Sequence, residues 1–168
     1  MRKIKFSAII FASILISSCA VHAVLEPPII TKNYPIEEYK YIVIPQTSSL
    51  NSGTGGVYGS RYGLYGAFSN KSVNPSDVIS GILLKEGFTI LPEVKPEFLD
   101  RTLIVNYGES GRRNAGGLRG YTIEVTIKFI SAKSYETTCS CTAEGQGSTE
   151  ADDIREAINR CLTGLFSK

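Results

Sequence analysis

Histidine is nearly absent from this chain of 168 residues, which contains a single one, His22. A nucleophilic triad built on histidine, or a metal site with several histidine ligands, is therefore excluded within one chain. Long hydrophobic runs are also missing, since the run from Phe6 to Ile16 has only 11 residues, too few to cross a bilayer as a helix. Serine, tyrosine and carboxylate side chains are present, but none stands at a nucleophile–base spacing typical of catalysis. We therefore expect a protein that is not an enzyme and that uses no cofactor or metal.

The start of the chain has the layout of a signal peptide for export. Arg2, Lys3 and Lys5 give it a positive beginning, and the apolar run follows directly. A run of this length between a positive start and small residues is typical of an export signal. We therefore expect residues 1–18 to act as a signal peptide.

The end of that run, Ile16-Ser17-Ser18-Cys19, resembles the lipobox of bacterial lipoproteins. By this resemblance the peptide would be cut before Cys19, whose thiol would carry a diacylglyceryl group, and the new amine would take a further acyl chain such as palmitate. Two or three acyl chains hold a protein stably on a membrane, whereas one is marginal. Two alternatives stay open: an uncleaved anchor, and cleavage after Ala23 by ordinary signal peptidase, which would release a soluble periplasmic protein.

Charge argues against a nucleic-acid partner. The whole chain carries 18 basic and 16 acidic side chains, a formal net charge of +2. Three of the basic ones precede Cys19, so a chain beginning there would have 150 residues and a net charge of about −1. DNA or RNA binding requires a basic field, which such a chain lacks. Its length suits a single domain with a two-layer core.

Residues 19–36 contain three prolines and little periodicity, which predicts a flexible tether between the lipid and the domain. Ala20 follows the lipobox cysteine. By the sorting rule of the lipoproteins that the lipobox resembles, a residue other than aspartate there directs the protein to the outer membrane. We expect the domain, residues 37–168, to face the periplasm of a Gram-negative cell and to contact the membrane through its N-terminal lipid.

Residues 51–70 form a stretch rich in glycine and tyrosine, which we interpret as a loop. It does not match a phosphate-binding loop, because its glycines do not give GxGxxG and no Gly-Lys-Ser/Thr follows. One interpretation is a plain surface loop. The other is a partner-binding loop in which glycine gives adaptability and aromatic side chains serve as anchors. The candidate anchors are Tyr58, Tyr62, Tyr65 and Phe68.

A second candidate contact surface is the segment 109–120, which carries Arg112, Arg113 and Arg119 among glycines. Arginine recognises phosphate and carboxylate groups, such as those of lipid headgroups, peptidoglycan or an acidic protein. The alternative is a solvated hairpin loop. Both surfaces would serve an envelope partner whose identity the sequence does not give.

The rest of the chain predicts an α/β (α+β) fold: a two-layer sandwich with a mixed four- to five-stranded sheet, antiparallel hairpins and two helices, in the order β-α-β-β-β-β-α. The clearest strand is 120–132, where apolar residues alternate with polar ones. A helix over 74–86 is indicated by Asn74 as its cap and by Gly87 after its end. A closing helix follows Ser148 or Thr149.

Three cysteines besides Cys19 lie near the end of the chain. Cys139 and Cys141 stand two apart on a strand and share a face, and Cys161 lies on the inner side of the closing helix. One disulfide joining Cys161 to Cys139 or Cys141 would close a loop of about 20 residues, worth roughly 3 kcal/mol. The alternatives are three reduced core residues, or a metal or redox site.

This order of elements resembles the small α/β domain of envelope lipoproteins, including the activators of penicillin-binding proteins and, by architecture, the lipoprotein of the curli secretion channel. The segment Glu144 to Leu162 resembles the end of small uncharacterised Bacteroides-type lipoproteins. The resemblance implies no catalytic residues. It implies a membrane-tethered binding or scaffold module for an envelope protein or peptidoglycan, or alternatively a self-assembling structural subunit. Pore formation is not expected, because long hairpins are not predicted.

Overall fold

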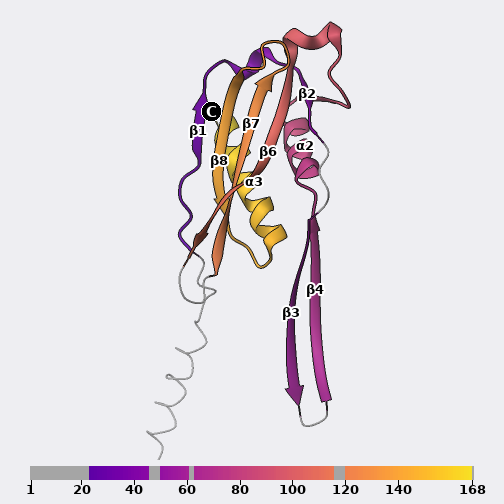
Figure 1. Cartoon of the computed structure of the whole chain (residues 1–168), viewed down its shortest axis with the longest axis vertical. Coiled ribbons are helices and arrows are strands. Elements are labelled where there is room, and N and C mark those ends of the chain that lie inside the picture. The colour runs from indigo at the N-terminus through magenta and orange to yellow at the C-terminus, as the bar shows by residue number, and fades with distance from the viewer. Residues whose placement is uncertain (1–22, 46–49, 61–62, 116–119, 168) are drawn as a thin grey trace, which may run out of the picture.

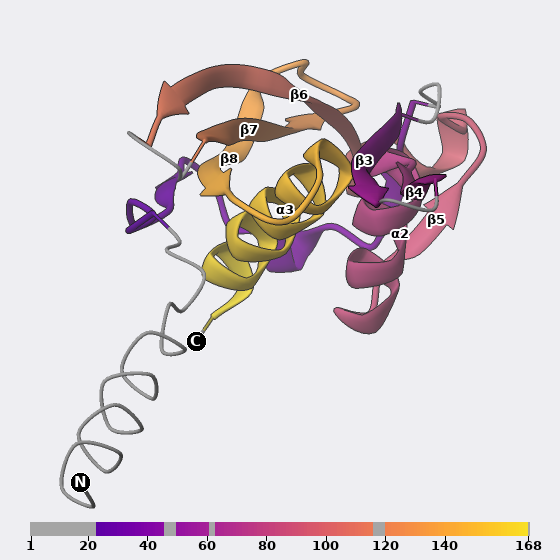
Figure 2. The same ribbon diagram turned by 90° about the horizontal axis from the view of Figure 1, so that it is seen from below.

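The computed structural model describes residues 23–45, 50–60, 63–115 and 120–167, which form two layers. One layer is a six-stranded sheet in the order β1-β8-β7-β6-β2-β5, and the helices lie on one face of it (Figure 1 and Figure 2). Its strands are β1 (Ile29–Lys32), β2 (Tyr41–Val43), β5 (Thr89–Leu91), β6 (Thr102–Asn114), β7 (Tyr121–Ser131) and β8 (Thr137–Gly145). The helices are α2 (Pro75–Lys85) and α3 (Glu150–Phe166), with short 3-10 turns η1 (Ile36–Glu38) and η2 (Pro96–Arg101).

The predicted fold class is confirmed, and the sheet is mixed. Strand β2 runs parallel to both β5 and β6, while the other neighbours in the sheet are antiparallel. The sheet has six strands rather than the predicted four or five, because β1 adds to the free edge of β8. Residues 29–32 belong to the stretch predicted as a flexible tether, so that prediction is wrong for this part of the chain.

The amphipathic strand β7 carries much of the core. Ile123, Val125, Ile127 and Phe129 are buried beneath the helices, as the alternation predicts, while Lys128 is exposed on the other face. The alternation fails only at the start of the strand. There Tyr121 is 40% exposed and Thr122 is fully buried, because the threonine hydroxyl takes part in the polar site described below.

Both helices begin with the predicted type of cap. The Asn74 Oδ1 accepts a hydrogen bond from the Ser76 N–H at 3.2 Å, and the Thr149 Oγ1 accepts one from the Asp152 N–H at 3.3 Å. Gly87 closes α2 with a φ of +92°, a conformation that favours glycine. The predicted inner face of α3 is buried throughout: Ile154, Ala157, Ile158, Cys161 and Leu165.

Aromatic rings close one end of the core between the two layers. The Phe129 ring meets the Phe166 ring edge-on, with centroids 6.4 Å apart, and the Phe88 ring lies 5.9 Å from that of Phe166. Such pairs stabilise a core beyond the area they bury. Within the described residues, no helix has the length and apolar character needed to cross a membrane.

The glycine- and tyrosine-rich stretch is a β-hairpin, which corrects its interpretation as a loop. Strands β3 (Leu50–Ser60) and β4 (Gly63–Val73) pair antiparallel over their whole length and form a separate two-stranded ribbon (Figure 1). Several glycines stand opposite a larger residue, as in the pairs Gly55–Phe68 and Gly59–Leu64. Glycine in the sequence favours a loop, but a partner strand in register satisfies its backbone as well as that of any other residue. The expectation of no long hairpin is therefore also wrong.

Candidate functional site

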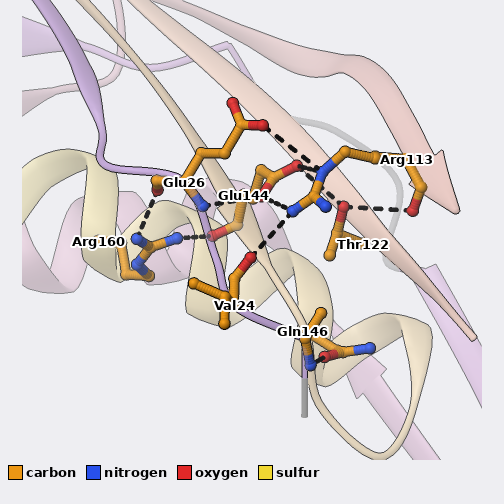
Figure 3. Close-up of polar contacts among 8 residues, drawn as sticks. Val24, Glu26, Arg113, Thr122, Glu144, Gln146 and Arg160 are labelled. Carbon is orange, nitrogen blue, oxygen red and sulfur yellow. Dashed lines mark hydrogen bonds and ion pairs between the residues drawn. The ribbon is translucent and has the colours of Figure 1, made fainter. Parts of the chain in front are cut away.

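A polar cluster occupies the end of the sheet where β6 and β8 finish and β7 begins (Figure 3). At its centre is Glu144, near the end of β8, which is only 6% exposed. Its carboxylate accepts two hydrogen bonds from Arg113, from Nε and Nη2, both at 2.6 Å. It also accepts one from the Thr122 Oγ1 at 3.1 Å and one from the Glu26 N–H at 3.0 Å. We call Glu26, Arg113, Thr122, Glu144 and Arg160 the polar clamp.

These donors fix the charge state of the central carboxylate. The hydrogen bonds from Arg113 are the main cause that lowers the pKa of Glu144 from 4.5 to about 2, against the opposing effect of burial. The Glu26 N–H, the Thr122 hydroxyl and the positive charge of Arg113 lower the Glu144 pKa further. Glu144 is therefore ionised at any physiological pH, and its oxygens are occupied by donors within the chain. This arrangement holds Glu144 as a bound carboxylate that orients its donors, rather than as a free acid or base.

The clamp holds the first described residues of the chain onto the domain (Figure 3). The Ala23 N–H donates to the Gln146 Oε1 at 2.5 Å, and Arg113 Nη2 donates to the Val24 carbonyl at 3.1 Å. Arg160, on α3, donates to the Glu26 carbonyl at 2.7 Å through Nη2 and to the main chain of β8 at 2.6 Å through Nη1. Residues 23–26 are thus held by β6 through Arg113, by the segment after β8 through Gln146, and by α3 through Arg160.

The same segment continues as an edge strand and is fixed again at its far end. Strand β1 pairs antiparallel with β8, from the pair Ile29–Thr142 to the pair Lys32–Cys139. Beyond it, the N–H groups of Asn33 and Tyr34 both donate to the Thr138 carbonyl, at 2.9 and 3.1 Å. We call residues 23–34 the N-terminal strap. Its strand is exposed at every side chain, so main-chain bonds and the clamp, rather than apolar burial, hold it in place.

The basic cluster proposed as a contact surface is engaged within the chain. Arg112 pairs with Glu109 at 2.5 Å and with Glu150 at 2.6 Å, and its guanidinium lies 5.2 Å from the Tyr121 ring centroid. Arg113 serves the clamp. Arg119 lies outside the described residues. The structure therefore brings the first two arginines to one end of the sheet but gives each of them carboxylate partners of its own.

The aromatic residues proposed as anchors belong to the hairpin. Tyr58 stands directly opposite Tyr65 across the β3–β4 pair, and Phe68 stands opposite Gly55. Tyr62 lies outside the described residues. The backbone thus places the described members of this set on a ribbon that extends away from the sheet (Figure 1).

One of the two alternative disulfides is present. Cys141 on β8 is bonded to Cys161 on α3, with their Cα atoms 5.5 Å apart. Cys139 is a buried free thiol, and burial is the main cause that raises its pKa to about 12, with the charge of Glu37 adding and that of Lys32 opposing. The thiol is therefore protonated at neutral pH, and a buried protonated thiol is a poor nucleophile. Cys19 lies outside the described residues.

A cavity of about 510 Å³ lies beside the C-terminal ends of α2 and α3. Its lining combines apolar side chains with two lysines and two glutamates, so it favours neither sign of charge: Ile36, Phe88, Phe166, Lys32, Lys40, Glu37 and Glu86. Among the described residues, no group of three or more histidine, cysteine or acidic side chains is placed to hold a metal ion.

Comparisons with known proteins show no family for this chain. No protein-family model matches the chain, and no curated protein matches it. A structural likeness exists to the PelC L103M dodecamer from Paraburkholderia phytofirmans, with 14% sequence identity and a TM-score of 0.48. It covers 84% of this chain and 98% of that one. The likeness concerns the arrangement of the backbone alone.

Proposed function

We propose that this protein is a non-catalytic lipoprotein of the cell envelope, attached to the outer membrane through Cys19 and displaying its domain to a periplasmic partner, a protein or peptidoglycan. The observation that carries the proposal is the position of the N-terminal strap. Its first described residue, Ala23, lies four positions after the lipobox cysteine, and a fully extended chain of that length spans at most about 14 Å. A lipid on Cys19 would therefore hold the clamp end of the domain close to the membrane surface.

The disulfide supports export. A bond between Cys141 and Cys161 forms and persists in an oxidising compartment, such as the periplasm, and is rare in a reducing cytosol. Cleavage after Ala23, the competing processing route, would remove the residue whose N–H donates to Gln146. Cleavage before Cys19 keeps the strap whole.

The test of anchoring is the mass and location of the mature protein in a Gram-negative host. We expect the protein to incorporate a palmitate analogue and to fractionate with the outer membrane. Its intact mass should be that of a chain that begins at an acylated Cys19. The Cys19→Ala variant should lose the label. A soluble mature protein beginning at Val24 would refute the proposal.

The test of binding is photo-crosslinking in cells from the hairpin, with a photoreactive residue in place of Tyr65. The matched control is Tyr135, which is 76% exposed in the turn between β7 and β8, at the opposite end of the sheet from the strap's beginning. A discrete adduct with an envelope component from Tyr65 alone supports a binding module. Equal adducts from both positions would argue against the hairpin as the contact surface.

A second candidate is a self-assembling structural subunit, and the ribbon favours it. Within the described residues, β3 and β4 pair only with each other, which leaves the outer edge of each strand without a neighbour. Unpaired strand edges are templates for pairing with another chain. Mass measurement in mild detergent separates the candidates. The whole chain has a mass of 18.3 kDa, and the mature chain is lighter by its signal peptide. A self-assembling subunit should give multiples of the mature mass, whereas a binding module should give the mass of a monomer.

A further inference from the structure

The β3–β4 hairpin has little internal support, because among the described elements it contacts α3 but pairs with no other strand. Each strand has 11 residues, and together they form a sheet of their own rather than part of the six-stranded one. The ribbon leaves the body beside α2 and α3 and extends well past the end of the sheet (Figure 1 and Figure 2). A single two-stranded hairpin is at best marginally stable in water, and it needs further strands or an apolar surface to pack against. Contacts with α3 hold the hairpin to the body, but within the described residues no further strand pairs with it, so the part that extends past the sheet must find its support outside the described part of the chain.

The direction of the hairpin indicates where that support lies. In Figure 1 the ribbon points toward the same end of the molecule as the start of the N-terminal strap, drawn in indigo. At about 3.3 Å per residue, a strand of 11 residues spans roughly 36 Å. Ala23 is bonded to Gln146, just after the end of β8, and is four positions from the expected lipid on Cys19. The membrane that holds the lipid is thus the surface toward which the hairpin extends.

The composition of the hairpin suits a lipid surface. Between Leu50 and Val73 there is no acidic residue, and the two charged residues, Arg61 and Lys71, are basic. The rest of the chain, by contrast, contains all 16 of the acidic residues. Tyrosine is enriched at the boundary between lipid and water, and basic residues are attracted to anionic headgroups. The turn-proximal half of the hairpin carries most of its large apolar and aromatic residues: Val57, Tyr58, Tyr62, Leu64 and Tyr65.

From these three observations we propose that the turn-proximal ends of the two strands, residues 57–60 and 63–66, insert into the interfacial layer of the membrane to which Cys19 is anchored. The inference rests on the proposed lipid anchor. The lipid surface supplies the packing that the ribbon lacks, and the hairpin gives the domain a second attachment point. Two attachment points, lipid and hairpin, fix the orientation of the domain on the membrane, whereas a lipid alone would leave it free to turn.

The absence of tryptophan from the chain allows a direct test. A single tryptophan is introduced as Leu64→Trp, near the turn, and as a second variant as Phe68→Trp, so that failure of one variant to fold does not decide the outcome. The control is Leu84→Trp on α2, at a position that is 55% exposed on the body of the domain. Each full-length acylated protein is reconstituted into vesicles of phosphatidylethanolamine and phosphatidylglycerol, with and without brominated acyl chains.

We expect the emission of L64W to shift to the blue in vesicles and to be quenched by the brominated chains, with F68W less affected and L84W unchanged. Vesicle flotation is measured on the same samples. Protein that floats while L64W and F68W stay unquenched overturns the hairpin inference and leaves the anchor standing. Protein that does not float overturns both. A blue shift that needs no vesicles and grows with protein concentration also overturns the inference, in favour of contact between copies.

Discussion

Replacing Glu144 by glutamine should loosen the N-terminal strap and destabilise the domain. The amide keeps the size of the side chain but removes the charge that accepts two hydrogen bonds from Arg113. It also turns one oxygen acceptor into a donor, which cannot satisfy the donors that surround it. We expect E144Q to lower the free energy of unfolding and to speed tryptic cleavage after Lys32, on the exposed strand β1.

The expected magnitude follows from the Glu144 pKa. A carboxyl pKa that falls from 4.5 in the unfolded chain to about 2 in the folded one corresponds to about 3 kcal/mol of stability at neutral pH. The Arg113 side chain is 40% exposed, so water screens part of the interaction. We therefore expect a loss of about 2 kcal/mol in E144Q, well above the effect of an ordinary surface substitution.

The pH dependence has a definite sign. Because the Glu144 pKa is lower in the folded protein, its stabilising contribution is complete above about pH 5 and is lost as the pH falls through about 2. The difference between wild type and E144Q should narrow over that interval. Asp153, whose pKa burial raises, changes stability in the opposite direction, but it is present in both proteins and cancels from the comparison.

Urea unfolding followed by circular dichroism, from pH 7 down to pH 2.5, measures this difference. The matched control is Glu109→Gln, which breaks the exposed pair with Arg112, whose two side chains are 39% and 44% exposed. That change should cost less than about 1 kcal/mol. Equal stability of E144Q and wild type at pH 7 would refute the role assigned to the clamp, and so would a difference that does not narrow in acid.

Three further predictions concern the contact between β8 and α3. Cys141→Ala should lower the free energy of unfolding by about 3 kcal/mol, the entropic contribution of a disulfide across 20 positions, and reduction of the wild type should lower it equally; an unchanged urea midpoint would contradict this. The Cys139 thiol should resist iodoacetamide at pH 8 in the folded protein and react in urea, because burial raises its pKa to about 12. Gly145→Ala should destabilise by more than 2 kcal/mol, since a Cβ there would overlap the α3 backbone. Gly81→Ala, in open space on α2, should instead stabilise by up to about 1 kcal/mol. A melting temperature of Gly145→Ala at or above that of the wild type would contradict the first expectation, and a lower one for Gly81→Ala would contradict the second.

Local sequence signals were enough for the elements whose boundaries depend on neighbouring residues. The caps Asn74 and Thr149 lie within three residues of the N–H groups that they accept from, so they are visible in the sequence. The alternation of apolar and polar residues in β7 is likewise visible in the sequence, and it follows from the burial of one face of the strand. The choice between Cys139 and Cys141 could not be made, because both lie on the same face and only the packed position of α3 decides which one meets Cys161.

The clamp could not be predicted, because its members come from distant parts of the chain. Glu144 and Glu26 are 118 positions apart, and Arg160 reaches a carbonyl 134 positions away. A glutamate at the end of a strand ordinarily faces water, and nothing near Glu144 in the sequence indicates burial. The prolines near the N-terminus favour a tether. The pairing of β1 with β8 overrides that local preference, and nothing in the sequence near β1 indicates this pairing. The arginine pair did indicate a polar site, but not that its partners are internal.

The pairing of β1 with β8 also determines when the domain can be completed. Ile30 pairs with Cys141, 111 positions further along the chain, so β1 cannot pair until β8, the last strand, has been made. Pairing between such distant segments is slow, because the intervening chain must be ordered before the contact forms. Until then the edge of β8 is open and a template for aggregation. The unfinished domain would therefore depend on chaperones during this interval, and faster closure of this edge would reduce that dependence.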